Sequence, residues 1–490
     1  KIASSHGYTN KEFHLNRSQA WQNALETIKP GDIVALTSSS PGAFQALEFA
    51  RAVKAKFGEK VLIIKGGTHE RLSSPVEQLK TNYPIDISFI GDAEIDFDKL
   101  LDVVEGHRNK PRNRERLKQK LESINHIRYF GRQRTDDYKL RGPTAIQMEI
   151  PDRPEPEMQF TIFKDPKPGS HMHRIMSLRG CPFTCTFCEI STKSRRASAK
   201  YFVEKIEEVV RKSYEGDNPK PIGYLFLEDG NFVTKNSKNG LRDRNIDLAG
   251  ADNYSSDIWI EQFTELMKAL NQRLKAEGKE ELKFAIQTRS DTLITTRADQ
   301  AEGEYEQVIQ KLKEAGLEAV YIGVDNTTGK NQFGKSTEPN DHLRAVDFLK
   351  STGVESSCST ILVPRQEQET IDLIEKLMNK GVQEIFTEYL KVFIDTADSR
   401  RVVDETEKQL SKDDIVALYT QGKYNMKSAS KEDNACLIVE PAGDKLKLVS
   451  DKELETLSHK AYKTIADLAK KYNYRVLNHG HYVRQTQVGL

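Results

Sequence analysis

The chain has 490 residues, of which 74 are Lys or Arg and 73 are Asp or Glu, so its formal net charge is +1 at pH 7. This neutral balance provides no electrostatic footprint for duplex nucleic acid or for an anionic membrane surface. A composition of 37% hydrophobic and 30% charged residues excludes a disordered chain, and no apolar run approaches the roughly 18 residues that a membrane-spanning helix needs.

Cysteine usage and the first residues indicate the compartment. Five cysteines are too few, and odd in number, for a disulfide scaffold, which favours a reducing, cytoplasmic location. The first residues lack the pattern of a secretory signal. Because the chain starts at Lys1 rather than at a methionine, its natural N-terminus is an open question.

Residues 31–106 alternate short apolar strands with helical stretches. We expect strands at 32–37, 61–65 and 87–90, with helices at 43–56 and near 75–81. This alternation predicts βαβ units and a doubly wound, Rossmann-like parallel sheet, whose ligands bind beyond the carboxyl ends of the strands. The loops at these ends read SSSPG (38–42), GGTH (66–69) and GDAE (91–94), and we expect them to converge.

Residues 107–170 change in character. They hold a basic run and a proline-containing connector, which predict a solvated surface linker.

Residues 173–390 return to strand–helix alternation. The expected strands are 173–178, 222–228, 282–288, 318–324, 357–363 and 383–390. The expected helices are 200–214, 257–277, 304–315, 338–352 and 367–380. Six steps are fewer than the eight of a closed barrel and predict a partial (β/α)6 barrel. The polar stretch 233–257 is expected to be a loop, and the region after residue 400 to be mostly helical, with one strand near 435–440.

Three of the five cysteines, Cys181, Cys185 and Cys188, fall within eight residues in the loop after the first strand of this barrel. Thiolates bind zinc, copper and iron–sulfur clusters. A structural zinc site normally has four ligands in two pairs, and only His171 and His173, before the cysteines, could add one. A [4Fe–4S] cluster held by three thiolates leaves one iron open to another ligand. The spacing favours the cluster, with zinc as the alternative.

The cysteine loop RGCPFTCTFC, which follows the strand HRIMSL, resembles the cluster loop of radical S-adenosylmethionine (SAM) enzymes, including the aromatic Phe187 before the last cysteine. The resemblance implies a partial (β/α)6 barrel in which SAM binds the open iron of the cluster. It also implies that reduction of the cluster cleaves SAM to a 5′-deoxyadenosyl radical.

The same resemblance implies a set of SAM-binding residues at the ends of successive strands. These are Glu228 and Asp229, Gln287 and Arg289, Asp325, and Arg196 in the segment after the cysteines. The loop after the fifth strand, LVPRQEQET, departs from the family because it lacks a glycine-rich turn.

The N-terminal domain is similar to the cobalamin-binding domains that are fused to radical SAM barrels. The resemblance implies cobalamin contacts from three loops, at Thr37, Ser38, Ser39, Ser40, Gly66, Gly67, Thr68, His69, Gly91, Asp92 and Glu94. A DxHxxG motif is absent, so a lower axial histidine ligand is not indicated, and His69 is expected to be a hydrogen-bonding loop residue.

The other two cysteines stand alone. Cys358 lies in an expected barrel strand and Cys436 in an apolar run, so both are expected to be small buried apolar side chains. A role for Cys358 in radical chemistry at the barrel lumen is a further hypothesis. Neither cysteine supports an auxiliary cluster.

These readings predict four regions: a cobalamin-binding-like Rossmann domain at 1–110, a linker at 111–160, a radical SAM barrel at 161–400 and a mainly helical domain at 401–490. The expected function is a cobalamin-dependent radical SAM methyltransferase acting at an unactivated carbon. Alternatives are a rearrangement, ring contraction or cyclisation with or without cobalamin, and a zinc-stabilised binding module. The expected partners are a small-molecule or peptide-like substrate and an electron donor such as flavodoxin or ferredoxin, in a monomer or dimer.

Overall fold

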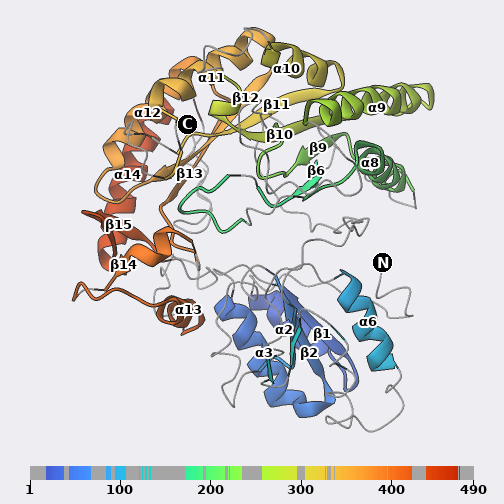
Figure 1. The fold of residues 1–490 in the computed structure, drawn as a ribbon, viewed down its shortest axis with the longest axis vertical. Coiled ribbons are helices and arrows are strands. Elements are labelled where there is room, and N and C mark those ends of the chain that lie inside the picture. Colours follow the sequence, from blue (N-terminus) through green and yellow to red (C-terminus); the bar gives the residue numbers. More distant parts are fainter. Residues whose placement is uncertain are drawn as a thin grey trace. The chain divides into compact units, whose positions relative to one another are not determined.

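A computed structural model gives the fold, and its description covers most of the two α/β regions (Figure 1). The described residues are 18–37, 43–67, 84–89, 94–105, 121, 124, 127–129, 132–133, 172–181, 183–190, 195–215, 219, 221–233, 256–294, 304–325, 327, 333–335, 337–393, 396–404, 406–421, 437–472 and 474. The chain divides into two compact units, one of residues 1–139, 390–462 and 475–490 and the other of residues 140–389 and 463–474. The four-region division stays a prediction.

The first unit is built on a five-stranded sheet of order β1-β2-β3-β4-β5. Its strands are β1 (Ile33–Thr37), β2 (Leu62–Gly66), β3 (Ile87–Phe89), β4 (Ile127–Tyr129) and β5 (Arg132–Gln133). The first three pair in parallel, as expected, whereas β4 and β5 are antiparallel. The sequence predicts a linker where β4 and β5 lie, and the structure places this hairpin in the sheet.

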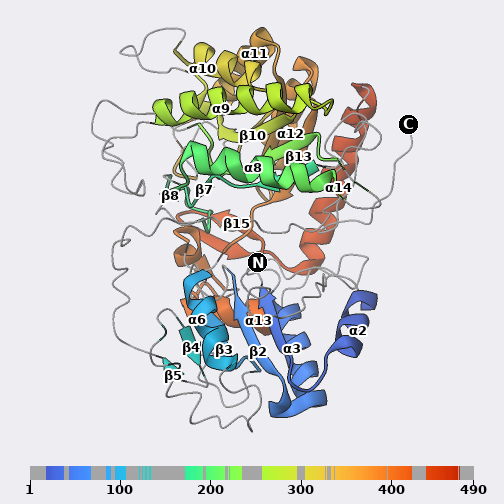
Figure 2. The ribbon, with the colours of Figure 1, turned by 90° about the vertical axis from the view of Figure 1, so that its right-hand side faces the viewer.

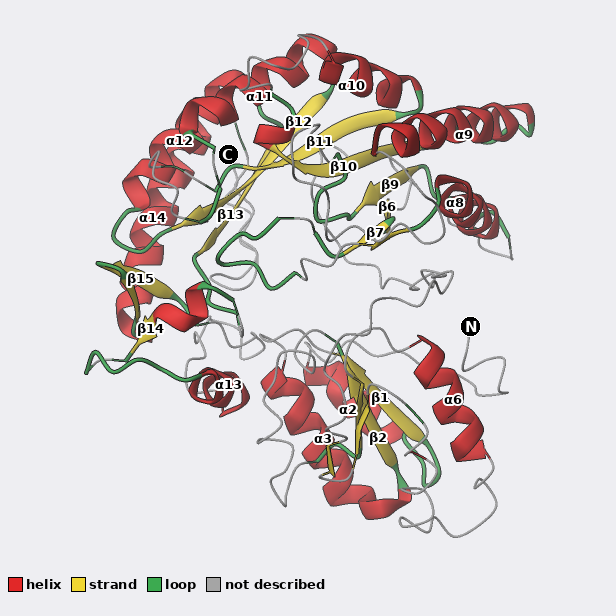
Figure 3. Ribbon diagram, in the orientation of Figure 1, coloured by secondary structure: helices red, strands yellow, loops and turns green. Residues whose placement is uncertain are grey.

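Helices cover both faces of this sheet, as Figure 3 shows. Helices α2 (Ser18–Thr27) and α3 (Ala43–Phe57) pack on one face through a core that includes Val34 and Ile63. Helix α6 (Glu94–Glu105) packs on the other face against Ile64 and Ile87. Adjacent strand residues therefore face opposite apolar layers, as in a doubly wound domain.

The C-terminal part of the first unit contains more strand than the sequence indicates. Strands β14 (Val402–Val403), β15 (Val439–Ala442) and β16 (Lys445–Leu448) form a small sheet beside helix α13 (Lys412–Gln421). β15 and β16 are an antiparallel hairpin whose two-residue turn starts at Gly443, at φ +65°. A glycine adopts this backbone conformation without strain, so a short hairpin forms where four-residue strands give little periodic signal.

The second unit is a parallel six-stranded half-barrel of order β13-β12-β11-β10-β9-β6. Its strands are β6 (Met172–Ile175), β9 (Tyr224–Leu227), β10 (Lys283–Arg289), β11 (Leu317–Gly323), β12 (Glu355–Leu362) and β13 (Glu384–Tyr389). All neighbours pair in parallel. The predicted partial (β/α)6 barrel is confirmed, with strand bounds within a few residues of those expected.

A layer of helices covers the convex face of the half-barrel (Figure 1). They are α8 (Ala199–Ser213), α9 (Ser256–Ala276), α10 (Glu304–Glu314), α11 (Pro339–Thr352) and α12 (Glu367–Lys380). Figure 2 shows α8 and α9 running side by side in front of the strands. Alternate strand residues such as Leu227, Ile286 and Ile322 are fully buried under this layer. The other face of the strands is the lumen, where Phe226, Ala285 and Ala319 form a separate small cluster.

Helix α14 (Asp451–Lys471) closes the chain's last described region, and its end belongs to the second unit. Lys471 and Tyr472 both bind Glu375 of α12, at 2.7 and 3.0 Å. Tyr474 donates its hydroxyl to the main-chain oxygen of Met378. Within the described ranges, no helix combines the length and apolar character that crossing a membrane requires.

Candidate active site

The three clustered cysteines lie in one loop at the carboxyl end of the half-barrel. The chain leaves β6, forms the short strand β7 (Leu178–Arg179), passes Cys181, Cys185 and Cys188, and returns through β8 (Arg195–Arg196) into α8. The loop crosses the concave side of the sheet (Figure 3). A turn from the Cys188 N–H to the Cys185 oxygen, at 3.2 Å, brings the last two cysteines together.

Burial and mutual proximity dominate the chemistry of these thiols. The pKa of Cys188 is raised to about 11, chiefly by burial, and the charges of Cys185 and Cys181 contribute to this increase. Burial also raises the pKa of Cys181, and Cys185 adds to that effect while the nearby cations Arg289 and Lys335 oppose it. Each thiolate therefore raises the pKa of its neighbours, and a metal or cluster that binds the cysteines as thiolates must displace their protons.

The donor set fits an iron–sulfur cluster. Three soft sulfur ligands from one loop suit a [4Fe–4S] cluster, in which each thiolate binds a different iron. Among the described residues, no three His, Cys, Asp or Glu side chains gather closely enough to hold one metal ion.

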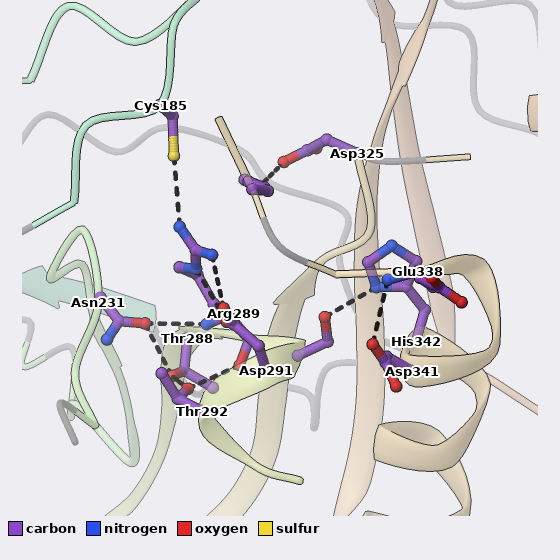
Figure 4. A network of polar contacts seen from close by, with 12 residues as sticks. Cys185, Asn231, Thr288, Arg289, Asp291, Thr292, Asp325, Glu338, Asp341 and His342 are labelled. Atoms are coloured by element: carbon purple, nitrogen blue, oxygen red, sulfur yellow. Dashed lines mark hydrogen bonds and ion pairs between the residues drawn. The ribbon is translucent and has the colours of Figure 1, made fainter. Parts of the chain in front are cut away.

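Arg289 is the first cation beside the cysteines (Figure 4). Its Nη1 lies 3.6 Å from the Cys185 sulfur, and its guanidinium stacks over the Phe183 ring at 4.1 Å. Two hydrogen bonds of 2.8 and 2.5 Å join it to the Asp291 carboxylate. Arg289 was expected near the cofactor, and the structure places it against the cysteine loop.

Lys335 is the second cation, and the sequence does not single it out. It forms a buried ion pair with Asp325 and lies 5.6 Å from the centre of the Phe187 ring. Phe187 packs edge-to-face on Phe333 at 5.3 Å, and the Thr186 N–H donates to the Phe333 oxygen at 3.0 Å. Residues 333–335 therefore dock directly on the cysteine loop. In the sequence, Gly334 and Lys335 are only a weak indication of a functional site, and the contact of residues 333–335 with the cysteine loop is what identifies them.

Asp229 and Arg196 lie inside the protein rather than at an open surface. Asp229 is fully buried and accepts hydrogen bonds from the N–H groups of Ser177 and Leu178 at 2.7 and 2.8 Å. Arg196 lies 3.6 Å from Asp229 and stacks on Trp259 at 4.5 Å. Burial raises the pKa of Asp229, and Arg196 opposes that effect.

The prediction that Asp229 and Arg196 contact SAM stays a prediction, and the structure gives both side chains partners inside the protein. Both side chains are committed to holding the start of the cysteine loop against the end of β9. Arg196 also donates to the Phe232 oxygen at 2.7 Å. A strand-end motif indicates where a residue lies along the chain, but it does not indicate which way the side chain turns.

Glu228 directly follows β9, and Gln287 lies two residues before the end of β10. The Glu228 carboxylate is partly exposed and bonds to Arg174 of β6 at 2.7 Å. Gln287 is half-buried, and its main-chain oxygen accepts from the Phe232 N–H at 2.8 Å. Their assignment to SAM binding stays a prediction.

Asn231 is buried and holds the end of β10 through hydrogen bonds, and the sequence indicates it only as part of a DGN turn after a strand. Its Oδ1 accepts from Thr288 Oγ1 at 2.9 Å and from the Arg289 N–H at 2.8 Å (Figure 4). The preceding Gly230 also lies against the cysteine loop, where an added Cβ would come 3.3 Å from the Cys181 Cβ. The DGN segment therefore fixes both the cysteine loop and the end of β10.

The lone Cys358 faces away from the lumen. It pairs in register with Ile322, and both are fully buried in the apolar core under the helices. This corrects the hypothesis that Cys358 takes part in chemistry at the lumen and leaves it as a small apolar core residue. Cys436 lies outside the described residues.

In the first unit, two of the three predicted loops leave neighbouring strand ends. Thr37 at the end of β1 pairs in register with Gly66 at the end of β2. A Cβ added at Gly66 would lie 3.8 Å from the Phe89 Cβ. Gly67 has φ +100°, a conformation that requires glycine, and Glu94 begins α6. The other predicted cobalamin contacts, Ser38, Ser39, Ser40, Thr68, His69, Gly91 and Asp92, lie outside the described residues.

Comparisons with known proteins agree with this architecture. Residues 175–379 match the sequence model of the Radical SAM superfamily, so this part of the chain is a radical SAM domain. An uncharacterized methyltransferase of Pyrococcus horikoshii is 23% identical over 355 residues, which are 71% of this chain and 64% of that protein. The hopanoid C-3 methylase of Methylococcus capsulatus is 20% identical over 200 residues, which are 40% of this chain and 30% of that protein.

Among solved structures, the radical SAM methyltransferase TsrM of Kitasatospora setae, with cobalamin and a [4Fe-4S] cluster bound, has a similar fold. The TM-score is 0.53 at 11% identity, over 96% of this chain and 84% of that chain. The chain therefore spans most of TsrM but less than two thirds of the length of the two curated relatives.

Proposed function

Because residues 175–379 are a radical SAM domain, we propose that the protein is a cobalamin-dependent radical SAM methyltransferase that methylates an unactivated carbon of a small molecule. The observation that carries the proposal is the loop of Cys181, Cys185 and Cys188 at the carboxyl end of a six-stranded half-barrel. That end of a barrel is where active sites form, because the loops there converge from several strands.

The cofactors would supply the difficult chemistry, and the chain would bind and orient them. A bound cluster with SAM supplies hydrogen-atom abstraction from an unreactive carbon, and bound cobalamin supplies the methyl group. Cys181, Cys185 and Cys188 would ligate three irons. Arg289 and Lys335 place positive charge beside these thiolates, which offsets the cost of keeping several anions together in a partly buried loop.

Other residues of the barrel have supporting roles in this proposal. Glu228, just after β9, and Gln287, near the end of β10, would bind SAM from the lumen. Asp229 and Arg196 hold the loop in place from the interior. Reduction requires a one-electron donor, for which flavodoxin or ferredoxin is the proposed class.

Two lines support the use of cobalamin and the transfer of a methyl group. The ends of β1, β2 and β3 carry Thr37, Gly66, Gly67 and the segment before Glu94, where a doubly wound sheet binds its ligand. The curated relatives are named as methyltransferases, and TsrM was solved with cobalamin bound.

Anaerobic purification of Cys185→Ala beside Cys358→Ala tests the proposal. We expect the wild type and Cys358→Ala to bind iron and sulfide and to release 5′-deoxyadenosine from SAM, since Cys358 packs under the helices. Cys185→Ala should lose both properties. Methyl-labelled SAM with added hydroxocobalamin then distinguishes methylation from rearrangement by the label in the product. A colourless wild type with stoichiometric zinc, or turnover by Cys185→Ala, would refute the proposal.

A further inference from the structure

The lumen face of the half-barrel carries two rows of side chains, and the cofactor proposal assigns roles only to Gln287 and Arg289 at the β10 end of these rows. Strand register aligns Glu384 of β13 with Ser357, Tyr321 and Gln287 of the preceding strands. In a parallel sheet, residues in register point to the same face, and Tyr321 packs with Phe226 in the lumen cluster. Glu384 therefore points into the lumen.

The next row of the lumen face lies beside Glu384. It contains Phe386, Ser359, Gly323 and Arg289, so small residues separate the aromatic ring from the arginine. Phe386 is 40% exposed although it is a large apolar side chain on the lumen face. Exposed apolar surface of this kind, beside small residues, is typical of a wall that a ligand covers.

Glu384 is incompletely partnered among the described residues. Tyr321 hydrogen-bonds to its carboxyl group, but Oε2 is buried with no hydrogen-bond partner, and no described cation forms an ion pair with it. Burial raises the pKa of Glu384 to about 8. Arg174 of the same face is already bound to Glu228 at 2.7 Å and stacked on Phe226 at 5.5 Å. An unpaired buried carboxylate is costly, so a cation at this point would be strongly favoured.

We propose that the substrate carries a protonated amine, and that Glu384 binds this amine while Phe386 contacts the adjoining apolar part. The inference rests on the proposed function in placing the substrate in the barrel lumen. An ammonium group would donate to the free Oε2 and neutralise the carboxylate, whereas an alcohol would satisfy only the hydrogen bond. A substrate carboxylate would be repelled, because the cations Arg174 and Arg289 on this face are each paired with a carboxylate of their own.

Binding of matched probes to the full chain tests this inference. The probes are 2-phenylethylamine, 2-phenylethanol and 3-phenylpropanoate, which share a phenyl ring and differ in charge. At about pH 8.5 the amine is still protonated, and Glu384 is largely ionised. By calorimetry or ligand-observed NMR we expect the amine to bind at least about tenfold more tightly than the alcohol, and the acid not to bind.

Variants identify the group responsible. Glu384→Gln keeps the size of the side chain and should weaken amine binding at least about tenfold while leaving alcohol binding unchanged. Glu355→Gln removes an exposed carboxylate of the same sheet face and should bind the amine like the wild type. Phe386→Ala should weaken both the amine and the alcohol. This variant keeps the inference testable if Glu384→Gln fails to fold.

A second arm identifies the source of the amine. A blocked tripeptide with a central lysine replaces the small amine, and binding of either probe that depends on Glu384 supports the inference. It is overturned if the wild type binds neither probe at about 10 mM, or if Glu384→Gln binds them as well as the wild type does. Iron and sulfide analysis of the same protein shows separately whether the proposed function fails.

Discussion

The pair formed by Asp229 and Arg196 shows how single buried charges support the cysteine loop. Asp229 binds the N–H groups of Ser177 and Leu178, and Arg196 is enclosed by Trp259 and Phe232. Removing one member of such a pair leaves the other charge buried without compensation, which typically costs about 3–5 kcal/mol.

We therefore expect Asp229→Asn to lower the free energy of unfolding by several kcal/mol, about 3–5, as measured by urea denaturation. Asp347→Asn is the control, because Asp347 pairs with Lys380 at 2.7 Å on the exposed surface. Such exposed pairs contribute about 1 kcal/mol or less. Equal losses in the two variants would show that the Asp229 pair has no special role.

Substitutions of Lys335 and of Asp325 should shift the reduction potential of a bound cluster in opposite directions. Lys335 places a positive charge near the cysteines, so Lys335→Met should disfavour the added electron and make reduction harder. Asp325→Asn leaves Lys335 without its counter-charge and should make reduction easier. We expect each change to alter the ratio of reduced to oxidised cluster about tenfold at fixed potential, or about 59 mV, by redox titration with EPR detection. Shifts of the same sign would indicate structural disturbance instead.

The raised pKa of Glu384 should make the free energy of unfolding depend on pH. Burial raises its pKa from 4.5 to about 8 in the folded chain. Between these values the folded chain holds a proton that the unfolded chain releases, so the stability contributed by this group is full below pH 4.5 and is lost as the pH rises through 8. Glu384→Gln cannot ionise. The wild type should therefore lose stability relative to Glu384→Gln over this range, and a constant difference in urea midpoints would contradict the assignment.

At the scale of elements, glycines set the paths between helices and strands. Gly316 joins α10 to β11 at φ +113°, and an added Cβ would lie 2.6 Å from the Leu282 oxygen. Gly381 ends α12 at φ +84°, with no heavy atom within 4 Å of an added Cβ. The two positions share an unfavourable backbone conformation but differ in the space around it.

Comparison of Gly316→Ala with Gly381→Ala separates these effects. Gly381→Ala should cost about 1–2 kcal/mol for the left-handed conformation alone. Gly316→Ala should cost more, about 3 kcal/mol or above, because the backbone must also move away from Leu282. Thermal or urea unfolding measures both. Equal losses of unfolding free energy in the two variants would mean that the backbone near Leu282 moves away from an added Cβ at Gly316 without a measurable cost.

The elements that the sequence predicts are those with long, periodic apolar patterns. The six barrel strands and their helices follow this rule, whereas β5 and β16 are only two and four residues long and are found only through their partners. The cysteine spacing identifies its site because the three ligands are local. Lys335, Asn231 and Glu384 act across strands, and their roles depend on register and burial, which motifs do not encode.

At the scale of the whole molecule, the two cofactor sites would be built by separate compact units. Thr37, Gly66 and Gly67 belong to the first unit, and the three cysteines belong to the second. Each sheet has its own apolar core residues, with Ile63 and Ile64 on the two faces of the first sheet and Ile286 and Ile322 under the helices of the half-barrel. Loss of one cofactor should therefore leave the fold that binds the other intact.

We expect Cys185→Ala to lose iron yet retain corrin after gel filtration with hydroxocobalamin, as judged by visible absorption. Gly67→Val should show the reverse, because a β-branched residue at φ +100° distorts the loop after β2 while the cysteine loop is unchanged. Thermal melting of both variants controls for global unfolding. If either change removes both cofactors from a folded protein, the sites depend on each other, and the cobalamin loops cannot be treated as an independent binding unit.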